Sequence, residues 1–208
     1  MTTTTPSKTV GTALLACTNQ ATAVVTVGSA IDVSGKFAAA ISVKLGRHSV
    51  VTALAAQVKF RLEASFSAVN DEWIPIQEWT SGTATTACNA PTVNDAGFAA
   101  ADTTFTISSA TGITAGDILF FYESGTIANS EWARVAGVSG TTITLEEPIT
   151  RGHTNAIYCC DYGEVWAFYV NVEPYKRVRL VVDTASSAST TACAVIGWLN
   201  TLDSLGTV

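Results

Sequence analysis

Strict alternation of apolar and polar residues between positions 58 and 66 constrains the fold of this chain more than any other feature. One side of the pattern is apolar and the other polar: Val58, Phe60, Leu62, Ala64 and Phe66 against Lys59, Arg61, Glu63 and Ser65. Successive side chains point to opposite faces of a β-strand, so this segment is predicted to be an antiparallel strand with one buried and one solvated face.

Segments with strand composition, separated by turn residues, recur along the chain. They are residues 21–27, 37–45, 58–66 and 73–79, then 104–108, 117–122, 131–138 and 141–145, and finally 156–160, 164–172, 177–183 and 191–199. They predict an all-β fold in which residues 21–97 and 155–208 form an antiparallel, jelly-roll-like β-sandwich. Residues 98–154, with short strands and glycine at the joins, are predicted to be inserted as a small β-barrel or meander. The Thr-rich start predicts a flexible N-terminal arm over residues 1–20.

Three of these segments carry signals about position. Pro75 has no backbone N–H to donate, which predicts an edge strand or a β-bulge. Residues 164–172 are apolar on both faces, which predicts a strand that is central or lies in an interface. Trp132 is assigned to the core of the inserted unit.

Composition argues against two kinds of partner. The formal net charge is −6 at pH 7, so counterion release from phosphates cannot drive binding, and we expect no direct contact with nucleic acid. No apolar run approaches the roughly 20 residues of a membrane-spanning helix, so we expect a soluble protein with no membrane partner, made and used without export. Charged residues are only 13% of the chain. The small uncharged residues that replace them suit flat surfaces against which another chain packs, which favours an oligomer.

The residues that usually carry chemistry are few and poorly spaced for it. The two histidines, His48 and His153, are predicted to be solvated or hydrogen-bonding turn residues and not catalytic bases. Adjacent carboxylates, as at Glu146-Glu147, are predicted to be solvated turns. The five cysteines form no Cys-x-x-Cys motif and are expected to be thiols, most of them buried. We predict no catalytic residue, no cofactor and no metal site.

Aromatic and basic residues are the candidates for contacts between chains. The tryptophans in the predicted sandwich are assigned to the core or to a subunit interface, with a sugar-binding platform as the alternative, and Trp73 and Trp79 are predicted to share one face of their strand. Arg177 and Arg179 are predicted to lie on the solvated face of a strand, with a salt bridge between subunits as the alternative. The candidate interface residues are Trp73, Trp79, Trp166, Arg177 and Arg179.

Several runs resemble small structural proteins of tailed bacteriophages. In the predicted sandwich they are Phe60-Arg-Leu-Glu-Ala-Ser65, Glu72-Trp-Ile-Pro-Ile-Gln-Glu-Trp-Thr80 and Lys176-Arg-Val-Arg-Leu-Val-Val-Asp183. In the predicted insert, Gly112-Ile-Thr-Ala-Gly-Asp-Ile-Leu-Phe120, Ser130-Glu-Trp-Ala-Arg-Val135 and Gly140-Thr-Thr-Ile-Thr-Leu145 are similar to small β-modules of phage head and tail proteins.

The resemblance implies a virion structural protein and no catalytic residues. Its first implication is a capsid decoration (cement) protein that stabilises the head through subunit contacts, and its second is a tail or neck component. It also implies a homotrimer that binds a major capsid protein or another virion protein, located in the virion after assembly in the host cytoplasm. A carbohydrate-binding or adhesive β-module is the alternative from another class.

Overall fold

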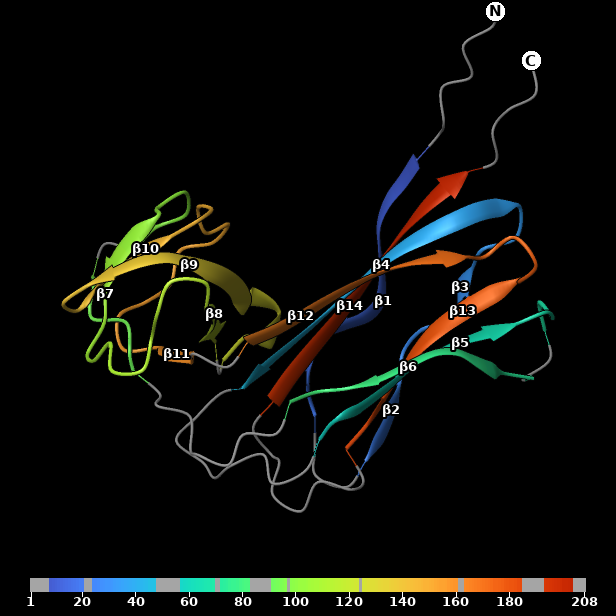
Figure 1. Ribbon diagram of the computed structural model, residues 1–208, viewed down its shortest axis with the longest axis horizontal. Coiled ribbons are helices and arrows are strands. Elements are labelled where there is room, and N and C mark those ends of the chain that lie inside the picture. The colour runs from blue at the N-terminus through green and yellow to red at the C-terminus, as the bar shows by residue number, and fades with distance from the viewer. Residues whose placement is uncertain are drawn as a thin grey trace, which may run out of the picture.

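Two antiparallel sheets face each other in the larger part of the molecule. The computed structural model describes residues 8–20, 24–47, 57–69, 72–82, 91–96, 98–123, 125–160, 163–184 and 193–203. Sheet A consists, in spatial order, of β1 (Lys8–Gln20), β14 (Cys193–Asp203), β4 (Lys36–Arg47) and β12 (Gly163–Asn171). Sheet B consists of β2 (Val25–Val27), β13 (Arg177–Asp183), β5 (Lys59–Ser65) and β6 (Ile74–Thr80), and β3 (Ile31–Asp32) also pairs with β13. Figure 1 shows sheet A above sheet B, with the remaining strands in a separate unit beside them.

The strand order is that of a jelly roll. The chain places β1 in sheet A, β2 in sheet B, β4 in A, β5 and β6 in B, β12 in A, β13 in B and β14 in A. Strands far apart in the sequence therefore pair, such as β1 with β14 and β2 with β13. This interlocking of two Greek keys defines the jelly roll, and the predicted jelly-roll-like antiparallel sandwich is confirmed.

Alternation within the strands sends one set of side chains into the space between the sheets. Ile41 and Leu45 of sheet A and Leu62 and Leu180 of sheet B are buried in one continuous cluster. Each such side chain stabilises the fold by roughly 1.5–3 kcal/mol when it leaves water. Phe66, predicted to share this face, lies beyond the end of β5 and is exposed.

The second unit, which we call the barrel, is inserted between β6 and β12. Its strands pair in the order β11 (Tyr158–Cys160), β8 (Ile118–Tyr122), β9 (Glu131–Ser139), β10 (Thr142–Leu145) and β7 (Thr104–Thr106), and the short 3₁₀ helix η1 (Ile127–Asn129) precedes β9. Residues 91–94 close the ring, because the N–H of Val93 donates to the Ile157 carbonyl and the N–H of Asn94 to the Thr106 carbonyl. The barrel has its own core, which includes Phe105, Leu119, Phe121 and Ile143.

The boundaries of the arm and of the insert differ from the prediction. The barrel extends from Pro91 to Cys160, beyond the predicted 98–154, because residues 91–94 and β11 supply the closing strands. The flexible arm predicted over residues 1–20 is wrong for its second part, since Lys8–Gln20 form β1; residues 1–7 lie outside the described residues. Neighbouring Leu14 and Leu15 are both buried, and bulges interrupt the pairing with β14. β1 thus lacks the alternation that marks a strand.

Both strands that flank the barrel lie at sheet edges. β6 ends sheet B, and its register with β5 shifts between the pairs Leu62–Gln77 and Glu63–Pro75. The prediction of an edge strand or a bulge at Pro75 is confirmed, and both occur. β12 is an edge strand of sheet A among the described residues. Residues 164–172 are predicted to be central or to lie in an interface, and the central position is wrong.

Candidate functional site

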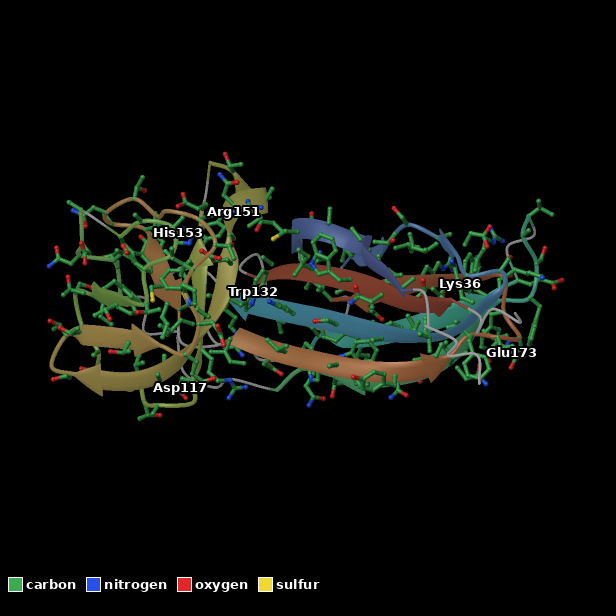
Figure 2. The ribbon with its side chains drawn as sticks, turned by 90° about the horizontal axis from the view of Figure 1, so that it is seen from above. Lys36, Asp117, Trp132, Arg151, His153 and Glu173 are labelled. Carbon is green, nitrogen blue, oxygen red and sulfur yellow. The ribbon has the colours of Figure 1, made fainter. Side chains whose placement is uncertain are left out.

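The outer face of sheet A is open. Figure 2 looks down onto it and shows β1, β14, β4 and β12 side by side, with no other strand above them. On β4, alternate residues enter the core and the others point outward. Ser42 pairs with Trp198 of β14 on one side and with Ala167 of β12 on the other, and Ala40 pairs in the same way with Asn200 and Tyr169. We call the outward-facing residues of these three strands the open face: Ala38, Ala40, Ser42, Val165, Ala167, Tyr169, Ile196, Trp198, Asn200 and Leu202.

The open face is nearly uncharged. Small side chains occupy its centre, while Tyr169 is 90% exposed and Trp198 is 36% exposed. A shallow hollow of about 260 Å³ is lined by residues that include Ala40, Tyr169 and Asn200. The charges of the open face come from the lysines of β4: Lys44 lies between Ile196 and Val165, and Lys36 lies at the other end of the strand. Exposed aromatic groups and a lack of charge are typical of the cores of contacts between proteins.

The barrel is docked on one end of sheet A over two glycines. Gly46 of β4 and Gly163 of β12 are paired directly. A Cβ at Gly46 would lie 2.2 Å from Phe120 Cγ, and a Cβ at Gly163 would lie 2.6 Å from Ile118 Cγ2. β8 of the barrel approaches the sheet so closely that only a residue without a side chain fits at either position.

Trp132 of β9 fastens the barrel to the sandwich. Its indole N–H donates to the carbonyl of Leu45 at 2.9 Å, and its ring centroid lies 4.5 Å from that of Phe120. Figure 2 shows Trp132 at the boundary between the two units. The prediction that Trp132 belongs to the core of the insert is wrong, because its side chain turns toward sheet A.

A pocket of about 440 Å³ lies where the open face meets the barrel. Lys44 and Trp198 line it from sheet A, and Glu131, Trp132 and Arg134 line it from the barrel. Lys44 Nζ lies 5.9 Å from the centroid of the Trp132 ring. Burial lowers the pKa of Lys44, against the opposing effect of the Glu131 carboxylate. The pocket therefore presents two indole rings together with charges of both signs.

His153 is held between two carboxylates beside this pocket. Its Nδ1 lies 3.1 Å from Glu123 Oε1 and its Nε2 lies 2.8 Å from Glu131 Oε1. The side chain has no exposed area, and the ring stacks on Phe121 with centroids 4.9 Å apart. Both ring nitrogens donate only in the charged imidazolium, so the geometry fits that form. Burial by itself lowers the pKa of His153, but the hydrogen bonds to Glu131 and Glu123 outweigh it and raise the pKa above its ordinary value.

The hydrogen bonds around His153 and Glu131 join connecting segments of the barrel. Glu131 also accepts hydrogen bonds from the hydroxyl and the N–H of Thr150, at 2.7 and 3.0 Å. Burial raises the pKa of Glu131, but the bonds from His153 and Thr150 outweigh it and lower the pKa. A ring closed to solvent has no route to a substrate, so we assign to His153 the task of holding the β8–β9 connection onto the segment before β11. Its predicted hydrogen bonding is confirmed and its predicted solvation is wrong; His48 lies outside the described residues.

The predicted interface residues fall into two separate places, and the first is the sandwich core. Trp79 stacks on Phe60 with ring centroids 5.3 Å apart, and its centroid lies 6.3 Å from that of Trp166. Trp79 and Trp166 are half-buried against the core cluster. They fill the gap between the two sheets where β6 and β12 form neighbouring edges.

The second place is the outer face of sheet B. The guanidinium carbons of Arg177 and Arg179 lie 4.9 and 4.1 Å from the ring centroid of Trp73. Arg179 donates from Nε to Glu63 Oε2 at 2.8 Å, and Glu63 is only 7% exposed. The arginines are thus half-buried and bonded within their own chain, and not on a fully solvated face. Trp73 and Trp79, predicted to share a face, lie on opposite faces, because the bulge at Pro75 shifts the alternation by one residue.

The thiols of Cys17, Cys159 and Cys160 are not joined in disulfides. Burial raises the pKa of the Cys17 thiol to about 11, so it stays protonated at neutral pH.

In the part of the chain that the structure describes, no group of His, Cys, Asp and Glu side chains is arranged to hold a metal ion, and no helix is both long and apolar enough to cross a membrane. Comparisons of the chain with protein-family models, with curated proteins and with solved structures found no match. The resemblance to phage structural proteins therefore stays a prediction.

Proposed function

We propose that this protein is a structural component of a bacteriophage virion, namely a capsid decoration (cement) protein that packs its open face on the shell. Its partner is then a major capsid protein or another virion protein, and its location is the virion, after assembly in the host cytoplasm. A tail or neck component would use the same surface on a different part of the particle. The proposal assigns the protein no catalytic role and no cofactor.

The open face is the observation that carries this proposal. In an antiparallel sandwich the outward residues of a sheet that meets water are commonly polar. Here Ala40 and Ser42 of β4 lie in the middle, and Asn200 and Trp198 of β14 pair with them. A shell-binding protein needs a broad area that loses its water without stranding charges, because an unpaired charge in an interface is costly. The open face has that composition.

The jelly roll by itself does not select this function. It occurs in viral capsid proteins, in lectins and in cupins, so function has to be argued from the surface. The phage-like runs Phe60-Arg-Leu-Glu-Ala-Ser65 and Ser130-Glu-Trp-Ala-Arg-Val135 add support from sequence. They form parts of β5 and β9, one in each unit.

The test is binding to heads of the encoding phage from which this protein is missing. Occupancy is measured by gel densitometry after the heads are separated by sedimentation. Trp198→Glu puts a charge into the open face, and we expect at least tenfold weaker binding, which corresponds to about 1.4 kcal/mol.

The matched control is Ala136→Glu, which adds the same charge to an exposed position of β9 in the barrel. It should bind as the unmodified protein does. Circular dichroism spectra of both variants should match that of the unmodified protein. Equal occupancy for Trp198→Glu and the unmodified protein would remove the open face from the proposal, and no binding by the unmodified protein would overturn it.

A carbohydrate-binding module is the second candidate, favoured by the pocket between the open face and the barrel. Trp132 and Trp198 both line it, and so do the carboxylates of Glu146 and Glu147. Indole rings stack on the apolar faces of sugars, and carboxylates accept hydrogen bonds from sugar hydroxyls. A glycan array tests this candidate. Binding that Trp198→Ala abolishes and Trp198→Phe partly keeps would support it, and an array without signal would rule it out.

A further inference from the structure

The four edges of the sandwich differ in how they are protected against pairing with another strand. Exposed edges present unpaired N–H and C=O groups, and natural proteins blunt them with bulges, proline, short length or charge. β1 has three register shifts against β14. β2 has only 3 residues. β6 carries Pro75 and a bulge. Three of the four edges therefore show a recognised form of protection.

β12 shows none of these forms of protection. All 9 of its residues pair with β4 without a register shift, so the strand is long and regular. It contains no proline, and its one charged side chain, Glu164, is turned to its own chain, where it accepts the N–H of Gly82 at 3.1 Å. No described strand pairs with its outer edge. Val165 and Tyr169 are exposed beside that edge.

We propose that β12 pairs with β12 of a second copy of this chain, antiparallel about a two-fold axis, so that sheet A continues from one copy into the other. Addition of a strand at a sheet edge satisfies the backbone groups of both strands. A two-fold axis brings the same surface of each copy together, which is the simplest closed assembly.

The sequence of β12 fits pairing with itself. A two-fold axis through Ala167, the middle residue of Gly163–Asn171, pairs the whole length of β12 with β12 of the second copy. Val165 then lies opposite Tyr169 of the second copy, which is a β-branched residue against an aromatic one, a stabilising cross-strand pair. Glu164 lies opposite Val170, so no like charges face each other.

Pairing of like with like gives a dimer and not the trimer that the phage resemblance implies. A three-fold arrangement through sheet edges needs two different edges that meet head to tail. β12 is the only sandwich edge in the described residues without bulge, proline or shortening, so a second open edge is lacking. The inference concerns the isolated protein and goes beyond the proposed binding to a shell.

The first experiment measures mass in solution by sedimentation equilibrium over a range of protein concentrations. We expect about twice the 21.7 kDa of a single chain. In parallel, Ala167→Cys places a thiol on the axis and should form a disulfide-linked dimer under mild oxidation. Ala136→Cys, at an exposed position of the barrel, controls for collisions, and the unmodified protein controls for the native thiols. A mass of one or three chains, or equal cross-linking at both positions, would overturn the inference.

The second experiment tests the register. The double variant Val165→Lys, Tyr169→Lys sets like charges opposite each other at two symmetric places, and should weaken dimerisation at least tenfold. The double variant Val165→Lys, Tyr169→Glu sets opposite charges at the same places and should dimerise as the unmodified protein does. Because both side chains are exposed, neither variant disturbs the core. Dimers of equal strength from both variants would show that the copies meet elsewhere.

Discussion

The two outer faces of the sandwich differ in how far their side chains are covered by the chain itself. On sheet B, Arg177 and Arg179 cover the ring of Trp73, and Arg179 is bonded to Glu63. On sheet A, Tyr169 and the small residues around it face outward with no described element over them. Sheet B thus engages these charged and aromatic groups within the chain, except that the indole N–H of Trp73 has no hydrogen-bond partner among the described residues. Sheet A leaves apolar and aromatic side chains of its outer face exposed to water, so the two faces differ within one fold.

The largest effect is expected where the barrel meets sheet A, because this contact forms one border of the open face. Gly46→Ala drives a Cβ into the buried ring of Phe120, and overpacking of this kind costs about 3 kcal/mol. Urea unfolding measures the loss. Gly137→Ala is the matched control, since a Cβ at Gly137 meets nothing within 4 Å and the variant should unfold as the parent does. Equal stability of the two variants would mean that the barrel does not rest on Gly46.

The next effect tests whether sheet B depends on its own polar contacts. Glu63→Ala leaves Arg179 without its carboxylate partner in a nearly buried place, and should cost about 2 kcal/mol of unfolding free energy. Glu173→Ala removes an exposed carboxylate from a turn and should stay within about 0.5 kcal/mol of the parent. A Glu63→Ala variant as stable as the control would remove the contrast between the two faces.

A smaller effect concerns pH and the wall of the pocket. The folded pKa of His153 lies above the ordinary 6.5, so its contribution to stability is complete below pH 6.5 and is lost as the pH rises through the folded value. The folded pKa of Glu131 lies below the ordinary 4.5, so its contribution is complete above pH 4.5 and is lost as the pH falls through the folded value. Thermal unfolding should therefore show the Tm falling as the pH is raised above 6.5. The same slope in His153→Gln would assign the fall to other groups.

The smallest effect is expected on the open face itself. Trp198→Ala removes an indole that is 36% exposed, and should change the unfolding free energy by no more than about 0.5 kcal/mol. Chemical unfolding is again the measurement. A loss above about 2 kcal/mol would show that the ring stabilises the monomer, and the open face would then resemble sheet B.

Much of the fold follows from alternation in the sequence. Residues 177–183 are predicted as a strand and form β13 with those bounds, because no glycine or proline interrupts the run from Arg177 to Asp183. β1 is missed because bulges place Leu14 and Leu15 both inside. A pattern of period two detects only strands that keep that period.

The open face and the contact between the barrel and sheet A are harder to predict from alternation. Ala38, Ala40 and Ser42 alternate with core residues, so their outward direction is readable, but a strand pattern does not tell whether another layer covers them. The contact of Gly46 with Phe120 joins positions far apart in the chain, which local patterns do not detect. Trp73 is assigned to the wrong face because one extra residue at a bulge reverses every side chain beyond it.

The hydrogen bond between Gly82 and Glu164 has a practical consequence. The chain leaves the sandwich at Gly82 and returns to it at Glu164, so the two ends of the inserted unit lie next to each other. A foreign domain whose own termini lie close together can therefore take the place of the barrel while the jelly-roll strands keep their order. On a regular shell, such a graft would turn each copy into a display position for cargo.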